Sequence, residues 1–144
     1  MPGIVVGFDG SGASQNALQW AVQHAAIEHV PLTVLAVHEV ATSAWTGNPL
    51  VYPEDRPEEE KARQAAQEAV NKIISDKNAH PESVTVRALS GQAANALIEA
   101  SGDADLVVVS SRGSGGFPHL RVGSVASKVV SHADCPVVVV RATD

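Results

Sequence analysis

The chain of 144 residues contains one cysteine, five aromatic residues and no long apolar run. The single cysteine, Cys135, cannot form an intramolecular disulfide, and a chain of this length buries enough surface to fold without one. Its apolar runs reach only four or five residues, whereas a membrane-spanning helix needs about 20. Because domains average about 150 residues, the length predicts a single domain over residues 1–144.

The amino-terminal residues MPGIVVGFDG contain no basic segment followed by a long apolar one. A secretory signal peptide needs both features. We therefore expect no signal peptide, no membrane association and a cytoplasmic location.

Positive charge is also scarce, since 10 basic residues face 16 acidic ones and the net charge is −6. Nonspecific nucleic-acid binding depends on Lys and Arg that neutralise phosphates, so we expect no nucleic-acid partner. The charge is unevenly spread. Residues 1–105 carry 14 acidic and six basic side chains, whereas residues 106–144 carry two acidic and four basic ones. The last quarter of the chain is where an anion would be least repelled.

Short β-branched runs, built from many of the 22 valines, alternate with segments of helical period. The pattern predicts strands over residues 4–8, 32–40, 84–89, 106–109 and 137–140. It predicts one helix that is capped by Ser11 and stopped by Pro31, a second that begins at Pro57 after a long loop over 41–56, and two more over 92–100 and 124–132.

Alternation of strand and helix is typical of a parallel sheet, because parallel strands need crossover connections. We therefore predict an α/β fold, with a five-stranded parallel sheet in the Rossmann-like order 3-2-1-4-5 and helices on both faces. Val107 to Val109 form a continuous apolar run, which favours an interior strand, and the alternation of Val84 to Arg87 favours an edge. Val137 to Val140 also form a continuous apolar run, but they belong to the last strand, which we expect at an edge of the sheet. An exposed apolar edge invites pairing, so we expect a second copy to cover it in a homodimer.

Ligands of such sheets bind beyond the carboxyl ends of the strands. The connection over residues 110–124, SSRGSGGFPHLRVGS, contains four glycines, four serines and two arginines. Backbone amides, hydroxyls and a helix that begins near Gly123 and Ser124 suit a phosphate. A surface loop rich in turn-forming residues is the alternative. The chain contains neither the P-loop motif nor the glycine spacing of a dinucleotide fingerprint.

The same connection resembles the motif of universal stress proteins that bind ATP, which is glycine, two residues, glycine, nine residues, glycine, then Ser or Thr. Gly113, Gly123 and Ser124 fit this frame, and Ser110 stands where the first glycine belongs. The opening VVGFDGS, the order of elements and the closing CPVVVV extend the resemblance across almost the whole chain.

The resemblance implies a site for ATP or another adenine nucleotide, such as AMP or cyclic AMP. Carried over by position, it places Gly7, Phe8 and Asp9 along the adenosine and Val37 against the base. It places Ser110, Arg112 and Gly113 near ribose and phosphates, and Gly123, Ser124 and Val125 at the phosphates. Asp9 could also help hold a nucleotide-bound Mg²⁺, or be only a turn or helix-cap residue. The six histidines lack a helical metal spacing, so we expect no metal site from protein alone.

The resemblance also implies a nucleotide-binding module in stress response or signalling. No residue of the 110–124 connection is an evident general base except His119, so we expect little or no hydrolysis. One alternative is a dimeric interaction protein that has lost nucleotide binding, because Ser110 replaces the first glycine. The other, an adenylate-forming enzyme, is disfavoured because Asp9-Gly10-Ser11-Gly12 lacks the Ser-Gly-Gly-x-Asp-Ser loop of that group.

Overall fold

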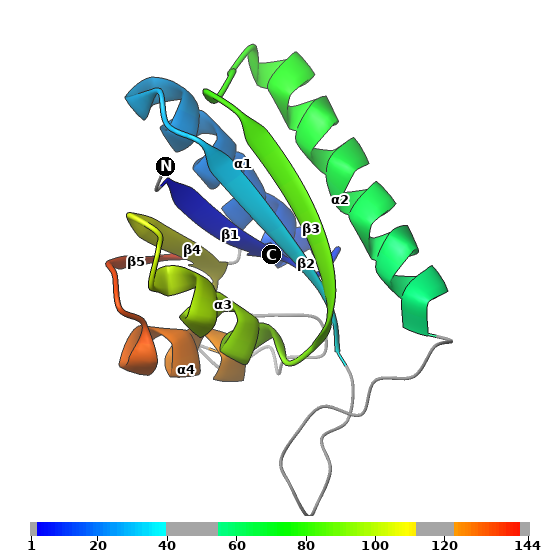
Figure 1. Ribbon diagram of the computed structural model, residues 1–144. Helices are drawn as coiled ribbons and strands as arrows, with labels where there is room; N and C mark the ends of the chain where they lie inside the picture. The colour runs from blue at the N-terminus through cyan, green and yellow to red at the C-terminus, as the bar shows by residue number, and fades with distance from the viewer. Residues whose placement is uncertain (1–2, 40–54, 112–122, 142–144) are drawn as a thin grey trace, which may run out of the picture.

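The fold alternates strand and helix along the chain, as the sequence pattern predicts (Figure 1). The computed structural model describes residues 3–39, 55–111 and 123–141. Its elements are β1 (Ile4–Phe8), α1 (Gly12–Glu28), β2 (Leu32–Glu39), α2 (Asp55–Lys77), β3 (Val84–Gly91), α3 (Ala93–Ser101), β4 (Leu106–Ser110), α4 (Ser124–His132) and β5 (Val137–Val140).

All five strands are parallel and lie in the order β3-β2-β1-β4-β5, which confirms the predicted topology. Ile4 of β1 pairs with both Leu32 of β2 and Leu106 of β4. The chain proceeds from β1 outward to β3 and then returns to β4 on the other side of β1. The carboxyl ends of β1 and β4 therefore flank the point where the strand order reverses, which is where ligands of such sheets bind.

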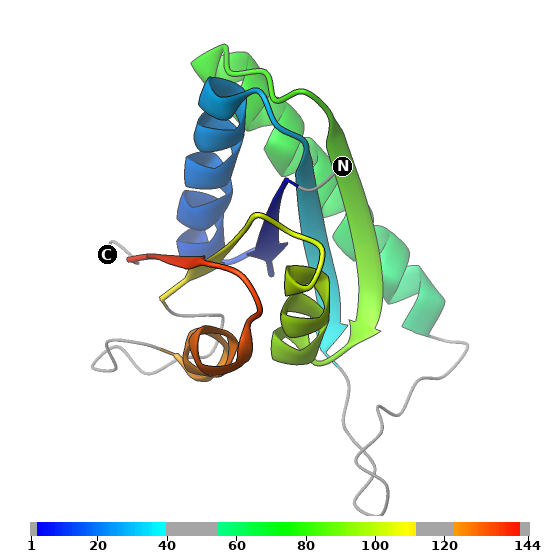
Figure 2. The ribbon, with the colours of Figure 1, turned by 60° about the vertical axis from the view of Figure 1, so that its left-hand side comes forward.

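Two helices cover each face of the sheet, and each pair encloses its own apolar core (Figure 2). Because successive side chains of a strand point to opposite faces, Val34 packs under α1 and α2 while Leu35 packs under α3 and α4. Leu18 and Leu97 are buried members of the two cores from the helical side. Burial on both faces explains why the interior strands lack polar alternation.

The two edges of the sheet differ in chemistry. Strand β3 exposes Thr85 and Arg87, an alternation that keeps an edge polar. Strand β5 presents four valines, Val137 to Val140, each half-buried. Both strands lie at the edges where the sequence placed them.

Several element boundaries differ from the predicted ones. Helix α1 ends at His29, which takes a left-handed conformation (φ 57°), so Pro31 lies two residues beyond the end rather than causing it. Helix α2 begins at Asp55, so the prediction that Pro57 occupies its first position is wrong. Proline is still tolerated there, because the first four N–H groups of a helix have no intrahelical acceptor. Strand β3 continues two residues further, to Gly91.

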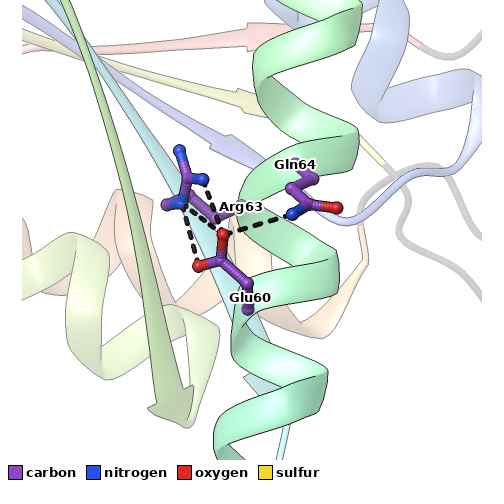
Figure 3. A network of polar contacts seen from close by, with 3 residues as sticks. All are labelled: Glu60, Arg63 and Gln64. Carbon is purple, nitrogen blue, oxygen red and sulfur yellow. Dashed lines mark hydrogen bonds and ion pairs between the residues drawn. The ribbon is translucent and has the colours of Figure 1, made fainter.

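The exposed face of α2 carries a polar network (Figure 3). Arg63 Nη2 donates to Glu60 Oε1 (2.6 Å), and the Gln64 amide donates to the same oxygen (3.3 Å). The hydrogen bond from Arg63 lowers the pKa of Glu60. This spacing of three and four residues supports the helix on its solvent side.

Candidate functional site

The carboxyl end of β1 is shaped by close packing against α3. A Cβ added to Gly7 would lie 3.1 Å from Leu97 Cδ1, so the missing side chain lets α3 approach the sheet. The side chain of Phe8 is 7% exposed and packs into the α1/α2 core. Of these two predicted site residues, Phe8 can therefore offer only its backbone to a ligand beyond the strand end.

The turn after β1 is held by side-chain hydrogen bonds. Asp9 Oδ1 accepts from the Ser11 N–H (2.9 Å), and the Asp9 N–H donates to Ser14 Oγ (3.3 Å). Ser11 Oγ accepts from the Ser14 N–H (3.1 Å), so Ser11 is the N-cap of α1, as predicted. Gly10 has φ 86°, a conformation that glycine adopts without strain. Asp9 is thus a turn residue, and the turn presents its exposed carboxylate beyond the end of β1.

Val37 lies at the same edge of the sheet, one residue beyond the point where β1 ends. Phe8 pairs with Ala36, and Val37 pairs with Leu89 of β3. The side chain of Val37 is half-buried and packs against the α3/α4 core, the face on which Gly7 meets Leu97. The structure therefore places Gly7 and Val37 on one face of the sheet, near the carboxyl ends of neighbouring strands.

The end of β4 is joined to the start of α4. The Ser111 N–H donates to the Val140 carbonyl (2.8 Å), and the Gly123 N–H donates to the Ser111 carbonyl (2.5 Å). Ser111 is only 4% exposed and Ser110 is half-buried. These bonds hold the two ends of the 110–124 connection together beside β1. Arg112 and Gly113, which the sequence also assigns to the site, lie outside the described residues.

The first turn of α4 suits an anion. Its N-cap, Gly123, has no side chain to cap the helix, and the turn contains no acidic residue. Ser124 is exposed, whereas Val125 is half-buried and packs against the α3/α4 core. The backbone N–H groups of such a turn lack intrahelical acceptors and lie at the positive end of the helix dipole. Negative charge is therefore stabilised at this position.

Contacts between elements fix the surroundings of this edge. Lys128 Nζ donates to Asn95 Oδ1 (2.9 Å) and so links α4 to α3. Ser90 Oγ donates to the Glu59 carboxylate and links β3 to α2. Sequence reasoning missed these pairs, and it also missed the buried Ser14 at the β1 turn. Only the apolar surroundings of Ser14, among Ala13, Ala17 and Leu18, could have indicated a buried hydroxyl.

Cys135 is a half-buried free cysteine. Partial burial raises the pKa of its thiol, and the charges of Asp105 and Asp134 raise it further, against a hydrogen bond with the Val107 backbone that lowers it. Within residues 3–39, 55–111 and 123–141, His, Cys, Asp and Glu form no group of three or more that could hold a metal ion. No helix in that part of the chain is both long and apolar enough to span a bilayer.

The model of the universal stress protein family matches residues 2–141. The chain belongs to the universal stress protein family. Two curated members are each 33% identical to it over 144 residues, one from Mycolicibacterium smegmatis and one, Rv2623, from Mycobacterium tuberculosis. The alignments cover 99% of this chain but 49% and 48% of those proteins. The chain thus spans about half the length of these universal stress proteins.

Solved structures of universal stress proteins share the fold. UspA from Lactobacillus plantarum matches with a TM-score of 0.71 and 24% identity, over 97% of both chains. A universal stress protein in complex with cAMP matches with a TM-score of 0.69 and 24% identity, over 99% of this chain and 98% of the other. One from Archaeoglobus fulgidus in complex with dAMP matches with a TM-score of 0.62 and 24% identity, over 96% of both chains.

Proposed function

We propose that this universal stress protein binds an adenine nucleotide at the carboxyl edge of its sheet, between β1 and β4. The observation that carries the proposal is the Gly123 to Ser111 hydrogen bond, which places the uncapped start of α4 beside the strand-order reversal. The positive balance of residues 106–144 favours an anion in the same region. Two proteins of the same fold support the nucleotide class, since their structures contain cAMP and dAMP.

Three groups of described residues would each contact a different part of the nucleotide. The amides of the first turn of α4 and the hydroxyl of Ser124 would hold the phosphates. The backbone at Gly7 and Phe8 and the turn at Asp9 would lie along the adenosine. Val37, which is half-buried, would offer an aliphatic contact to the base. With only five aromatic residues in the chain, an aliphatic contact is favoured over stacking.

Ser110 replaces the first glycine of the ATP-binding motif, and its position is compatible with nucleotide binding. It is the last residue of β4 and is half-buried, so it lies at the mouth of the connection rather than within the core. A hydroxymethyl group there would add a hydrogen-bond donor toward the ribose. Ser110 has no left-handed strain to overcome, because His29 and Asn78 are the only described non-glycine residues with a positive φ.

ATP is the ligand we favour, with Mg²⁺ bound by the phosphates and assisted by Asp9. The Asp9 carboxylate is a suitable Mg²⁺ ligand by chemistry, and it is exposed beyond the end of β1. We expect hydrolysis to be slow or absent, because the described residues at this edge, Ser110, Ser111, Gly123 and Ser124, offer no general base. His119, the one candidate base of the connection, lies outside the described residues. Nucleotide occupancy would then act as a signal in stress response.

Denaturation of the purified protein, followed by mass spectrometry of the supernatant, tests the nucleotide directly. Released ATP, AMP or cyclic AMP would support the proposal. Thermal unfolding with added nucleotide provides a second arm, because a ligand at about 100 times its dissociation constant adds about 2.7 kcal/mol to the free energy of unfolding. No released nucleotide and no shift with millimolar ATP or cyclic AMP would favour the alternative, an interaction protein that has lost nucleotide binding.

We also propose a homodimer in which a second copy covers Val137 to Val140. The support is the contrast between the two edges, since β3 is protected by Arg87 and Thr85 whereas β5 presents half-buried valines. Unprotected apolar edges pair with other chains. Light scattering at micromolar concentration checks the oligomeric state.

A further inference from the structure

A hollow lies at the end of the sheet opposite the proposed nucleotide site. It has a volume of about 210 Å³, and its walls include Val5, Thr33, Leu35, Arg87, Ala100 and Asp103. Pockets for drug-sized ligands span about 300–1,000 Å³, whereas a cavity of about 150 Å³ holds one benzene ring. The hollow is therefore too small for a nucleotide and suits a ligand about the size of one amino acid.

The hollow exists because α3 is shorter than the strands it covers. Nine residues of helix span about 13.5 Å, whereas the eight residues of β2 span about 26 Å. Helix α3 ends at Ser101, and the chain that follows it, with Asp103 and Ala104, forms one wall of the hollow near the amino ends of β1 and β2. Thr33 pairs with Val5, and each is the second residue of its strand.

Backbone contacts fix the frame of the hollow. The Ile4 N–H donates to the Pro31 carbonyl (3.0 Å), and the Asp105 N–H donates to the Gly3 carbonyl (2.9 Å). A Cβ at Gly3 would lie 2.3 Å from the Pro31 oxygen, so only glycine permits this contact. These contacts fix the backbone at the wall of the hollow that Gly3, Ile4 and Pro31 form.

The chemistry of the hollow combines an apolar floor with two opposite charges. Val5, Leu35 and Ala100 are buried or half-buried aliphatic side chains. Arg87 comes from β3 and Asp103 follows α3, and both are exposed. Neither forms an ion pair with another described side chain. A ligand with one charge would satisfy one of them and be repelled by the other.

We propose that the hollow binds a small aliphatic α-amino acid. Its carboxylate would pair with the Arg87 guanidinium, a planar donor that matches carboxylate geometry. Its ammonium group would pair with the Asp103 carboxylate. Its side chain would contact the half-buried walls at Thr33, Ala100 and Ala104, because Val5 and Leu35 beneath them are only 8% and 2% exposed. The site shares no residue with the nucleotide site proposed above, so it stands or falls independently.

Titration of the ¹⁵N-labelled full chain with L-leucine, followed by NMR, tests this site. We expect saturable shifts at Thr33 and Leu35. 4-Methylpentanoate and 3-methylbutylamine, which each retain one charge, should bind about tenfold more weakly, because each loses one charge-assisted hydrogen bond.

Matched variants complete the test. Arg87→Gln and Asp103→Asn should each weaken leucine binding about tenfold, whereas Arg63→Gln on the exposed face of α2 should leave it unchanged. Both pocket residues are exposed, so the fold should persist, and the NMR spectrum verifies it. The proposal is overturned by an absence of saturable shifts, by equal binding of the one-charge analogues, or by unchanged binding in both pocket variants.

Discussion

At the scale of a residue, Gly7 illustrates how a missing side chain permits close helix packing. Its missing Cβ leaves room for Leu97, whose side chain is 2% exposed. We expect Gly7→Ala to lower the free energy of unfolding by about 1 kcal/mol, because the new methyl group presses on Leu97. Denaturant unfolding measures the effect.

The control for this prediction is the same change in a Leu97→Ala background. Leu97→Ala alone should cost about 2–5 kcal/mol through the cavity it creates. Gly7→Ala should then be neutral or stabilising, because its methyl group enters that space. An equal cost in both backgrounds would show that Gly7 does not act through Leu97.

Cys135 provides a pH-dependent prediction. Partial burial and the nearby Asp105 and Asp134 carboxylates raise the pKa of its thiol. The thiolate, which is the reactive form, should therefore accumulate only at a higher pH than in a free cysteine. The rate of alkylation by iodoacetamide, followed against pH, should rise with a midpoint above that of a cysteine blocked at both ends, N-acetylcysteinamide. A midpoint at or below the reference would contradict this assignment.

At the scale of elements, the proposed homodimer depends on β5. Val138 pairs with Val108 of β4 and packs against the α1/α2 core while remaining half-buried. We expect Val138→Asp to place an uncompensated charge in the proposed dimer contact and to yield a monomer in light scattering. The matched change Thr85→Asp on the opposite edge, β3, should leave the dimer intact. A monomeric wild type would refute the proposed contact.

Strand β5 also shows what the sequence could and could not predict. Its continuous valines and last position predicted an edge strand, and the alternation of strand and helix predicted a parallel sheet. The Rossmann-like order 3-2-1-4-5 that we predicted for that sheet is the order in the structure. The start of α2 was missed because Pro57 is compatible with several positions of a first helical turn. Propensity alone does not decide between neighbouring residues at a helix end.

At the scale of the whole molecule, features built from one local motif could be predicted from the sequence, and features that join distant residues could not. A candidate phosphate site at the carboxyl edge of the sheet could be predicted because Gly123 and Ser124 belong to one local motif. The Gly7–Leu97 contact and the hollow between Arg87 and Asp103 could not, since each joins residues far apart in the chain. Such contacts depend on the length of α3 and on the twist and register of strands, which no local pattern encodes.

The whole arrangement places the start of α4 at the carboxyl end of β4, the strand that pairs with β1, and binding of an adenine nucleotide there is the central claim. Isothermal titration of ATP into the wild type and Gly123→Val measures it most directly. Gly123 has φ −75° and ψ 171°, a conformation that valine also adopts, so the fold should persist. A bulky side chain at the helix start should block the phosphates and weaken binding at least about tenfold, by loss of charge-assisted hydrogen bonds.

The matched control is Gly102→Val, at the far end of α3, where an added Cβ would meet only an ordinary 3.5 Å contact with the Glu99 carbonyl. We predict saturable ATP binding in the wild type and in Gly102→Val, and binding at least about tenfold weaker in Gly123→Val. Equal affinity of Gly123→Val and wild type, or no heat of binding in a folded wild type, would contradict the account.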